Sequence, residues 1–240
     1  MRTSDNETSE SVDVCLVTLR GFDQSFKAML RDAIPSMNQL IVDSTTKPLG
    51  KAREAIIEKV TTEKFVFVDD DVFLPRGWFD MMMKYWDKDS GWLEGWAVPT
   101  HPPWYHNWTM SRFKRAQPVA LGVNQRAFTL DTIIKTEAVA DWRSPEGLDF
   151  YEDWEMAKHT LGRGFSVKRV PVASEHRIPY DVWSQLDKGI KQLKRSGKSS
   201  YGARVEYGFN AAASAIIASI RERDVRIASN GIKYGLKYII

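Results

Sequence analysis

Short apolar runs alternate with helix-like segments along the first third of the chain. The run Val12–Leu19 predicts a strand, and the segment that follows it to Ile34 has helical spacing before Pro35. Further on, the pattern predicts strands over Gln39–Val42 and Phe65–Val68 and, between them, a helix over Gly50–Val60. This alternation predicts a parallel, doubly wound α/β sheet.

The rest of the chain is less regular. The pattern predicts a helix at Trp78–Tyr85, a long functional loop with short strands over Gly91–Pro118, a strand at Phe128–Ile134, a helix at Tyr151–Leu161 and an edge strand at Phe165–Val172. Gly162 and Gly164 would end the last helix. From Tyr180 the pattern is helical, with turn signals at Ser196-Gly197 and Ser199–Gly202.

Composition and charge divide the chain into three parts. Residues 1–11 are polar and acidic and predict a disordered leader, residues 12–180 form the α/β domain, and residues 181–240 form a basic helical extension. The net charge is only +3, but the segment from Ser184 holds 11 Lys and Arg against 4 Asp and Glu. No nucleic-acid recognition motif accompanies this basic charge, so we expect no nucleic-acid partner.

The cellular compartment is predicted from the cysteine content and from the length of the longest apolar stretch. Cys15 is the single cysteine, which excludes an intrachain disulfide and favours a reducing compartment. The longest stretch of low charge, Tyr207–Ile220, is shorter than the roughly 20 apolar residues of a spanning helix. We therefore expect a cytoplasmic protein, with a peripheral position at the inner face of the membrane as the alternative.

Three consecutive carboxylates, Asp69, Asp70 and Asp71, follow the third predicted strand. Ligands of doubly wound sheets bind beyond the carboxyl ends of the strands, where this triplet falls. The three charges repel one another unless a cation or ordered donors compensate them, and oxygen ligands suit Mg²⁺ or Mn²⁺. The competing interpretation is an acidic, solvated turn.

Several segments together resemble a known family. The segment FVFVDDDVFLP at 65–75 resembles the DXD segment of family 2 glycosyltransferases and related GT-A enzymes. Three more segments resemble others of the family in the same order: Ile41–Ser44, LGKAREAI at 49–56 and YEDWEMAKHTLGRGFSVKRVPVASEH at 151–176. The resemblance covers roughly residues 12–178, and it implies a GT-A-type fold, Rossmann-like with a doubly wound mixed sheet, followed by the helical extension.

The resemblance implies a donor site and a metal site. A UDP- or GDP-linked sugar would be contacted by residues after the first three strands and by one arginine: Thr18, Arg20, Asp43, Arg53, Asp69 and Asp70. The family often has Asn after this arginine, and this chain has Glu54. The metal, Mn²⁺ or Mg²⁺, would be held by Asp71 and Asp69 and completed by His176; a structural histidine is the alternative for His176.

The resemblance also implies a proton acceptor. Asp153 would act as general base on the acceptor hydroxyl, with inversion at the anomeric carbon, while Glu152 would orient the acceptor or Asp153. The alternative is that these acidic residues only complement the positive end of a helix dipole. His101 and His106 are five residues apart with no cysteine or acidic residue near them in sequence, so we expect no metal site there.

Aromatic and basic residues are the candidates for contact with an acceptor or a membrane. Trp104, Arg112 and Trp154 are candidates for contact with a glycan or lipid-linked acceptor. The basic C-terminal segment suits an anionic membrane surface, or else a solvated helix face. Two other functions stay open: a sugar-nucleotide nucleotidyltransferase, although the chain lacks that class's Gly-rich phosphate loop, and a non-catalytic sugar- or lipid-binding module.

Overall fold

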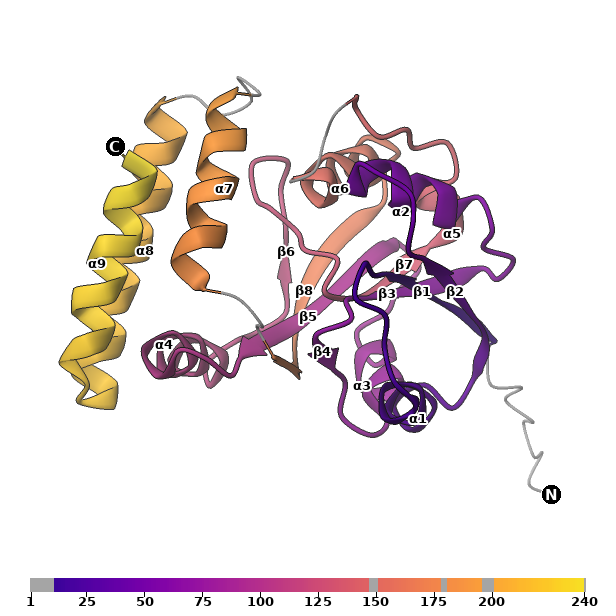
Figure 1. Cartoon of the computed structure of the whole chain (residues 1–240), viewed down its shortest axis with the longest axis horizontal. Coiled ribbons are helices and arrows are strands. Elements are labelled where there is room, and N and C mark those ends of the chain that lie inside the picture. The colour runs from indigo at the N-terminus through magenta and orange to yellow at the C-terminus, as the bar shows by residue number, and fades with distance from the viewer. Residues whose placement is uncertain (1–10, 147–150, 178–180, 196–200, 240) are drawn as a thin grey trace. The chain divides into compact units, whose positions relative to one another are not determined.

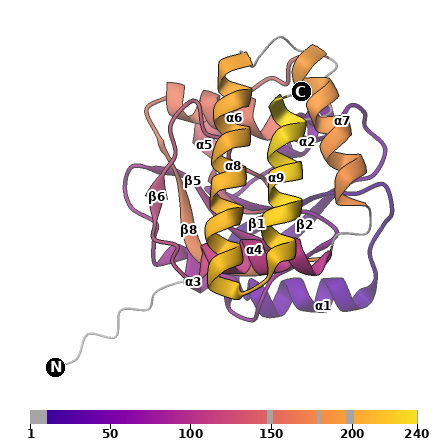
Figure 2. The same cartoon turned by 90° about the vertical axis from the view of Figure 1, so that its left-hand side faces the viewer.

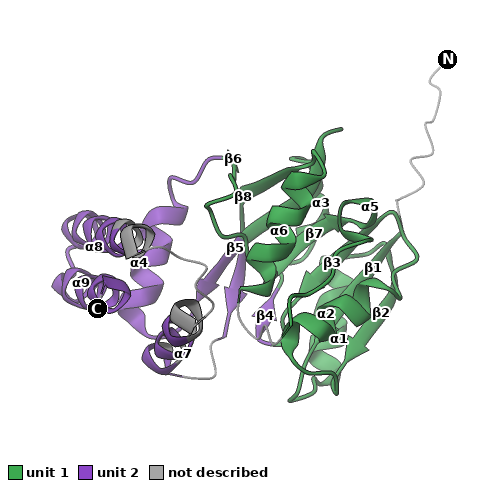
Figure 3. Cartoon of the chain, turned by 90° about the horizontal axis from the view of Figure 1, so that it is seen from above, with its two compact units in different colours: residues 1–70, 74–95, 118–172 green, residues 71–73, 96–117, 173–240 purple. Residues whose placement is uncertain are grey.

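The computed structural model describes residues 11–146, 151–177, 181–195 and 201–239. Nearly all of the predicted leader and the turn signals at 196–200 lie outside the described residues. The chain forms two compact units (Figure 3): unit 1 comprises Met1–Asp70, Leu74–Gly95 and Pro118–Val172, and unit 2 comprises Asp71–Phe73, Trp96–Gln117 and Ala173–Ile240.

Unit 1 is built on a mixed sheet. Its strands lie in the order β2 (Met37–Asp43), β1 (Val12–Val17), β3 (Lys64–Val68), β7 (Asp131–Lys135), β5 (Ser90–Pro99) and β8 (Ser166–His176), and the two-residue β6 (Val119–Ala120) pairs with β8. β1 pairs in parallel with β2 and β3, as predicted, whereas β7 is antiparallel to both β3 and β5. The predicted mixed, doubly wound α/β class is confirmed.

Helices cover both faces of this sheet. Figure 1 shows α2 (Leu49–Ile57), α5 (Thr136–Val139) and α6 (Glu152–Gly162) on one face and α1 (Gln24–Ala33) and α3 (Trp78–Met83) on the other. The Asp23 side chain caps α1 by accepting a hydrogen bond of 2.9 Å from the Phe26 amide. The helices predicted in these regions are confirmed.

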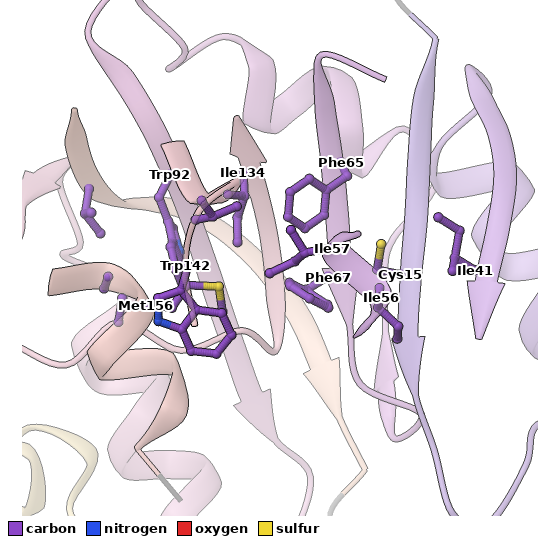
Figure 4. Packing of buried hydrophobic residues seen from close by; sticks show 14 of the residues in the cluster. Cys15, Ile41, Ile56, Ile57, Phe65, Phe67, Trp92, Ile134, Trp142 and Met156 are labelled. Carbon is purple, nitrogen blue, oxygen red and sulfur yellow. The ribbon is translucent and has the colours of Figure 1, made fainter. Parts of the chain in front are cut away.

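The core of unit 1 lies between the sheet and α2 and α6. β3 is buried along its whole length. The rings of Phe65 and Phe67 meet edge to face, with their centres 5.2 Å apart (Figure 4). Burying a large apolar side chain stabilises a fold by about 1.5–3 kcal/mol, so apolar strands of this kind dominate its stability. Cys15 belongs to this cluster, and burial raises the pKa of its thiol well above the ordinary value.

Two predictions were wrong. The stretch 91–118 is no long loop, because it contains the ten-residue strand β5 and the helix α4 (Pro103–Phe113). Pro103 at the first turn suits a helix start, and Trp104, Trp108 and Ser111 share its buried side. β8 is no edge strand either, since it lies between β5 and the short β4 (Val72–Phe73) in the strand order.

Unit 2 consists mainly of helices. α8 (Tyr201–Glu222) and α9 (Val225–Ile239) lie side by side (Figure 2), and α4 packs against both, while α7 (Val182–Arg195) packs against α9. Gly208 and Gly235 allow the close approach, because a Cβ on either would meet the carbonyl oxygen of the other. Among the described residues, no helix combines the length and apolarity needed to cross a membrane.

An aromatic cluster holds these helices together. The ring of Trp104 stacks on that of Trp183 of α7, with the ring centres 5.5 Å apart, and on that of Trp108, with the ring centres 6.2 Å apart. The indole nitrogen of Trp108 donates to the Ser214 hydroxyl at 2.9 Å, and the ring of Tyr234 lies edge-on to Trp108. α4 is thus part of the same packed cluster as the C-terminal helices.

Candidate functional site

The parallel strands of unit 1 deliver polar residues to one edge of the sheet. Thr18 follows β1, Asp43 ends β2, and Asp69 and Asp70 follow β3 directly. Because β1, β2 and β3 are parallel, their carboxyl ends lie at the same edge, where ligands of doubly wound sheets bind.

Asp70 is held by two of the predicted donor-site residues. The Thr18 hydroxyl and the Arg20 guanidinium both donate to its carboxylate, and Arg20 Nε lies 3.3 Å from Oδ2. Thr18 Oγ1 also accepts from the Gly21 amide at 2.9 Å. These contacts supply the donors that an isolated carboxylate would lack, and they fix the loop after β1 against the end of β3.

Asp43 binds its own loop. Its carboxylate accepts hydrogen bonds from the amides of Thr45 and Thr46, both at 2.9 Å, and from the Thr46 hydroxyl at 2.7 Å. Burial opposes the charged form, but these hydrogen bonds outweigh it and lower the pKa of Asp43. Asp43 is therefore an ionised residue that shapes the turn after β2.

Arg53 lies between two acidic residues. It comes from α2, its side chain is only 4% exposed, and its guanidinium lies 3.5 Å from Asp69 Oδ1 and 3.4 Å from Glu152 Oε1. Arg53 Nε and Nη1 are buried without a hydrogen-bond partner among the described residues, and so is Glu152 Oε2. Buried N–H groups without partners are costly, so this arrangement has donors available for an anionic or polar ligand.

Asp153, the neighbour of Glu152 at the start of α6, has a strong partner that the sequence did not indicate. Arg126 Nε lies 3.1 Å from Oδ1, and Arg126 Nη2 lies 2.8 Å from Oδ2. The guanidinium also lies 4.5 Å from the ring centres of Phe128 and Tyr151. Such a bidentate, stacked arginine fixes the carboxylate in place.

A second buried pair supports the first. Glu94 on β5 accepts from Arg169 Nη2 of β8 at 3.0 Å, and the same Arg169 nitrogen donates to the Arg126 carbonyl at 3.0 Å. Burial raises the pKa of Glu94 to about 7 against the opposing effect of Arg169. Burial likewise raises the pKa of Glu152 to about 7, opposed by Arg53 and reinforced by the charge of Asp153.

Tyr151, which precedes this acidic pair, has a left-handed backbone conformation with φ of 65°. Such a conformation is uncommon for a residue with a bulky side chain and is found preferentially at functional sites. It turns the chain into α6, so that Glu152 and Asp153 occupy the first helical turn. Acidic side chains at this position also interact favourably with the positive end of the helix dipole.

The other predicted metal ligands belong to unit 2. His176 Nε2 lies 3.4 Å from Asp71 Oδ1, and this nitrogen is buried without a hydrogen-bond partner among the described residues. The Asp71 carbonyl accepts from the Arg177 amide at 2.8 Å, which joins the segment before β4 to the end of β8. In the described parts of the chain, no group of three or more His, Cys, Asp or Glu side chains is arranged to hold a metal.

The predicted acceptor residues lie apart in the sequence and in their surroundings. Trp154 is half-buried in unit 1 and donates to the Val123 carbonyl at 3.0 Å. In unit 2, Trp104 is 8% exposed within the aromatic cluster, whereas Arg112 is exposed and its guanidinium lies 5.5 Å from the centre of the Trp96 ring. His106 bonds the Pro99 carbonyl through Nδ1 at 2.9 Å.

Sequence reasoning missed Arg126, Glu94 and Arg169. Glu94 and Arg126 lie outside the segments that resemble the glycosyltransferase family, whereas Arg169 lies inside the segment at 151–176 but matches no functional residue of the family. One signal was present: Glu94 is a charged residue inside a run that is otherwise apolar or small, which predicts a buried partner. Nothing in the sequence identified Arg169 as that partner, or Arg126 as the partner of Asp153.

Solved structures share this fold. Glucosyl-3-phosphoglycerate synthase from Mycobacterium tuberculosis, in complex with Mg²⁺ and UDP, matches with a TM-score of 0.51 at 12% identity, over 79% of this chain and 80% of that chain. Mannosyltransferase PcManGT from Pyrobaculum calidifontis, in complex with GDP-Man and Mn²⁺, matches with a TM-score of 0.52 at 11% identity, over 80% of this chain and 66% of that chain. These matches confirm the GT-A-type fold.

No protein-family model matches the chain, and no curated protein sequence matches it either. At the identities of the two structures, the likeness establishes the fold alone, and function has to be argued from the residues of this chain.

Proposed function

We propose that the chain is a metal-dependent glycosyltransferase that moves a sugar from a UDP- or GDP-linked donor to an acceptor hydroxyl with inversion. The observation that carries this proposal is the buried Arg53, whose Nε and Nη1 make no hydrogen bond to any described residue although Asp69 and Glu152 lie beside the guanidinium. A diphosphate or a nucleotide base would supply the missing acceptors.

The donor site follows from the same edge. Arg53 would contact the nucleotide, and Asp69, whose side chain is 30% exposed, would hold the ribose or a metal-bound water. Thr18, Arg20 and Asp70 already bond one another, so their part is to shape the loop around the donor. Asp43 fixes the turn after β2, beside which the base would lie.

A Mn²⁺ or Mg²⁺ ion fits Asp71 and His176 of unit 2, because a carboxylate oxygen and an imidazole nitrogen 3.4 Å apart are two suitable donors. This nitrogen is buried and lacks a hydrogen-bond partner among the described residues. Ions of this kind complete their coordination with water and substrate phosphates. When bound, the metal would neutralise the charge of the departing nucleoside diphosphate.

Asp153 is our candidate for the general base. Arg126 orients its carboxylate, and part of this contact has to be exchanged for the acceptor hydroxyl. Glu152 is the rival base, because its Oε2 lacks a hydrogen-bond partner among the described residues and its pKa is raised to about 7. Turnover that rises through about pH 7 would favour Glu152.

The deciding experiment is calorimetric titration of UDP, GDP and their sugar conjugates, with Mn²⁺ and with EDTA. We expect binding to require the metal and to disappear in Asp71→Ala. Asp80→Ala, which removes an exposed aspartate of α3, is the matched control and should bind as the wild type does. Failure of every nucleotide to bind under either condition would contradict the proposal and favour a non-catalytic module.

A further inference from the structure

A pocket of about 290 Å³ opens in unit 2 where α4 meets α8. Three arginines line it: Arg112 and Arg115 at the end of α4 and Arg221 at the end of α8. Ser111 and Ser214 line it as well. The pocket therefore gathers several cationic donors, which is the chemistry that recognises phosphate.

The positive charge of this pocket is left uncompensated. Arg112 lies over the Trp96 ring, and Arg115 Nη2 contacts the carbonyl oxygen and hydroxyl of Ser111 at 3.2 and 3.3 Å. In the described part of the chain, no carboxylate pairs with any of the three guanidinium groups. Neighbouring basic residues are paired, since Lys114 contacts Glu222 at 3.3 Å and Arg226 contacts Asp224 at 2.8 Å.

The helix beside the pocket presents apolar side chains to solvent. Ile217 lines the pocket and is 47% exposed, and Ile216 and Ile220 of the same helix are 42% and 74% exposed. Exposed apolar groups next to a cationic pocket suit a ligand that carries an anionic head and an apolar chain.

We propose that this pocket binds the phosphate group of an anionic lipid, whose apolar chain lies along the exposed isoleucines of α8. A soluble phosphate ester shares the head-group chemistry, but it would make no use of the isoleucines. The inference goes beyond sugar transfer, because no residue of the pocket belongs to the proposed donor, metal or base groups; Arg112 alone is also a candidate for acceptor contact.

The test is sedimentation of the full chain with vesicles of phosphatidylcholine, alone or mixed with phosphatidic acid. We expect binding to the mixed vesicles only. Arg112→Gln/Arg221→Gln should weaken it about 30-fold, which corresponds to about 1 kcal/mol for each arginine at an anionic surface. Arg31→Gln/Arg76→Gln, which removes two exposed arginines of unit 1, is the control matched in charge and should bind nearly as the wild type does.

Two further arms separate the sources of phosphate. Ile217→Ser/Ile220→Ser should weaken vesicle binding, and glycerol phosphate in calorimetry should bind much more weakly than the vesicles. Binding of glycerol phosphate as tight as vesicle binding would overturn the lipid assignment in favour of a soluble phosphate. Absence of vesicle binding, or equal loss in the two arginine pairs, would overturn the proposal itself; circular dichroism verifies that each variant is folded.

Discussion

The two units differ in the arginines at their candidate ligand sites. In unit 1, Arg53 is buried beside Glu152, and the half-buried Arg126 pairs with the buried Asp153. Unit 2 leaves Arg112 and Arg221 exposed and without a carboxylate partner among the described residues. Buried pairs cost desolvation energy and have value chiefly when they fix a geometry, whereas exposed unpaired arginines keep their charge for a ligand.

The largest expected effect contrasts the carboxylates of the two units in catalysis. Asp153→Asn should lower kcat by about 100- to 10,000-fold, because a positioned general base contributes a factor of this size. Donor affinity, measured by calorimetry, should change little. Asp224→Asn, which changes the partner of the exposed Arg226 in unit 2, is the counterpart and should turn over normally. Unchanged kcat in Asp153→Asn would remove Asp153 from the chemistry.

The next contrast is between arginines in stability. Arg126→Ala should lower the free energy of unfolding by about 3–5 kcal/mol, because it leaves the buried Asp153 carboxylate without its partner. Arg112→Ala should change it by less than about 0.5 kcal/mol, as exposed substitutions do. Urea unfolding followed by circular dichroism measures both. Equal effects of the two variants would show that the units do not differ as described.

A third test concerns what holds unit 2 together in place of buried ion pairs. Gly235→Ala should lower the free energy of unfolding by about 1–3 kcal/mol, because the added Cβ meets the Gly208 carbonyl oxygen. Gly162→Ala in unit 1 has open space around the added Cβ and should be neutral or slightly stabilising. Thermal unfolding of the two variants compares them, and a stable Gly235→Ala would contradict the close helix contact.

The last contrast is a dependence on pH from the buried carboxyls of unit 1. Glu94 and Glu152, with pKa values raised from 4.5 to about 7, hold protons in the folded state that the unfolded chain has already lost. The free energy of unfolding should therefore fall as the pH rises through this window.

Urea unfolding on either side of that window measures the fall. Glu94→Gln should reduce it, because the variant no longer has a carboxyl to titrate there. Glu222→Gln in unit 2 should leave the fall as large as in the wild type. A wild-type stability that rises with pH would contradict the assignment.

Much of unit 1 was predictable from sequence. β1 and β3 are apolar runs buried on both faces, which is a strong local signal, and their order with α1 and α2 predicted the parallel pairing. Arg53 contacts Asp69 and Glu152 in the structure, and all three come from segments that resemble one family. Such features depend on short-range pattern and on residues at the ends of strands.

The rest depends on contacts that no local pattern contains. α4 mixes prolines and aromatics with polar residues, so its buried side, Trp104, Trp108 and Ser111, is visible only once the partner helices are known. Arg126 is 27 residues from Asp153 in sequence and belongs to no motif. Long-range charge pairs of this kind require the folded chain.

Two strands of the structure run through both units: β5 leaves unit 1 after Gly95, and β8 leaves it after Val172. Unit 2 is consequently not a separate segment at the end of the chain, since it also contains residues 71–73 and 96–117. Removing residues 181–240 would strip the aromatic side of α4, and a graft of those residues onto another protein would lack Trp104 and Trp108. A truncation or graft therefore has to keep the C-terminal helices and α4 together.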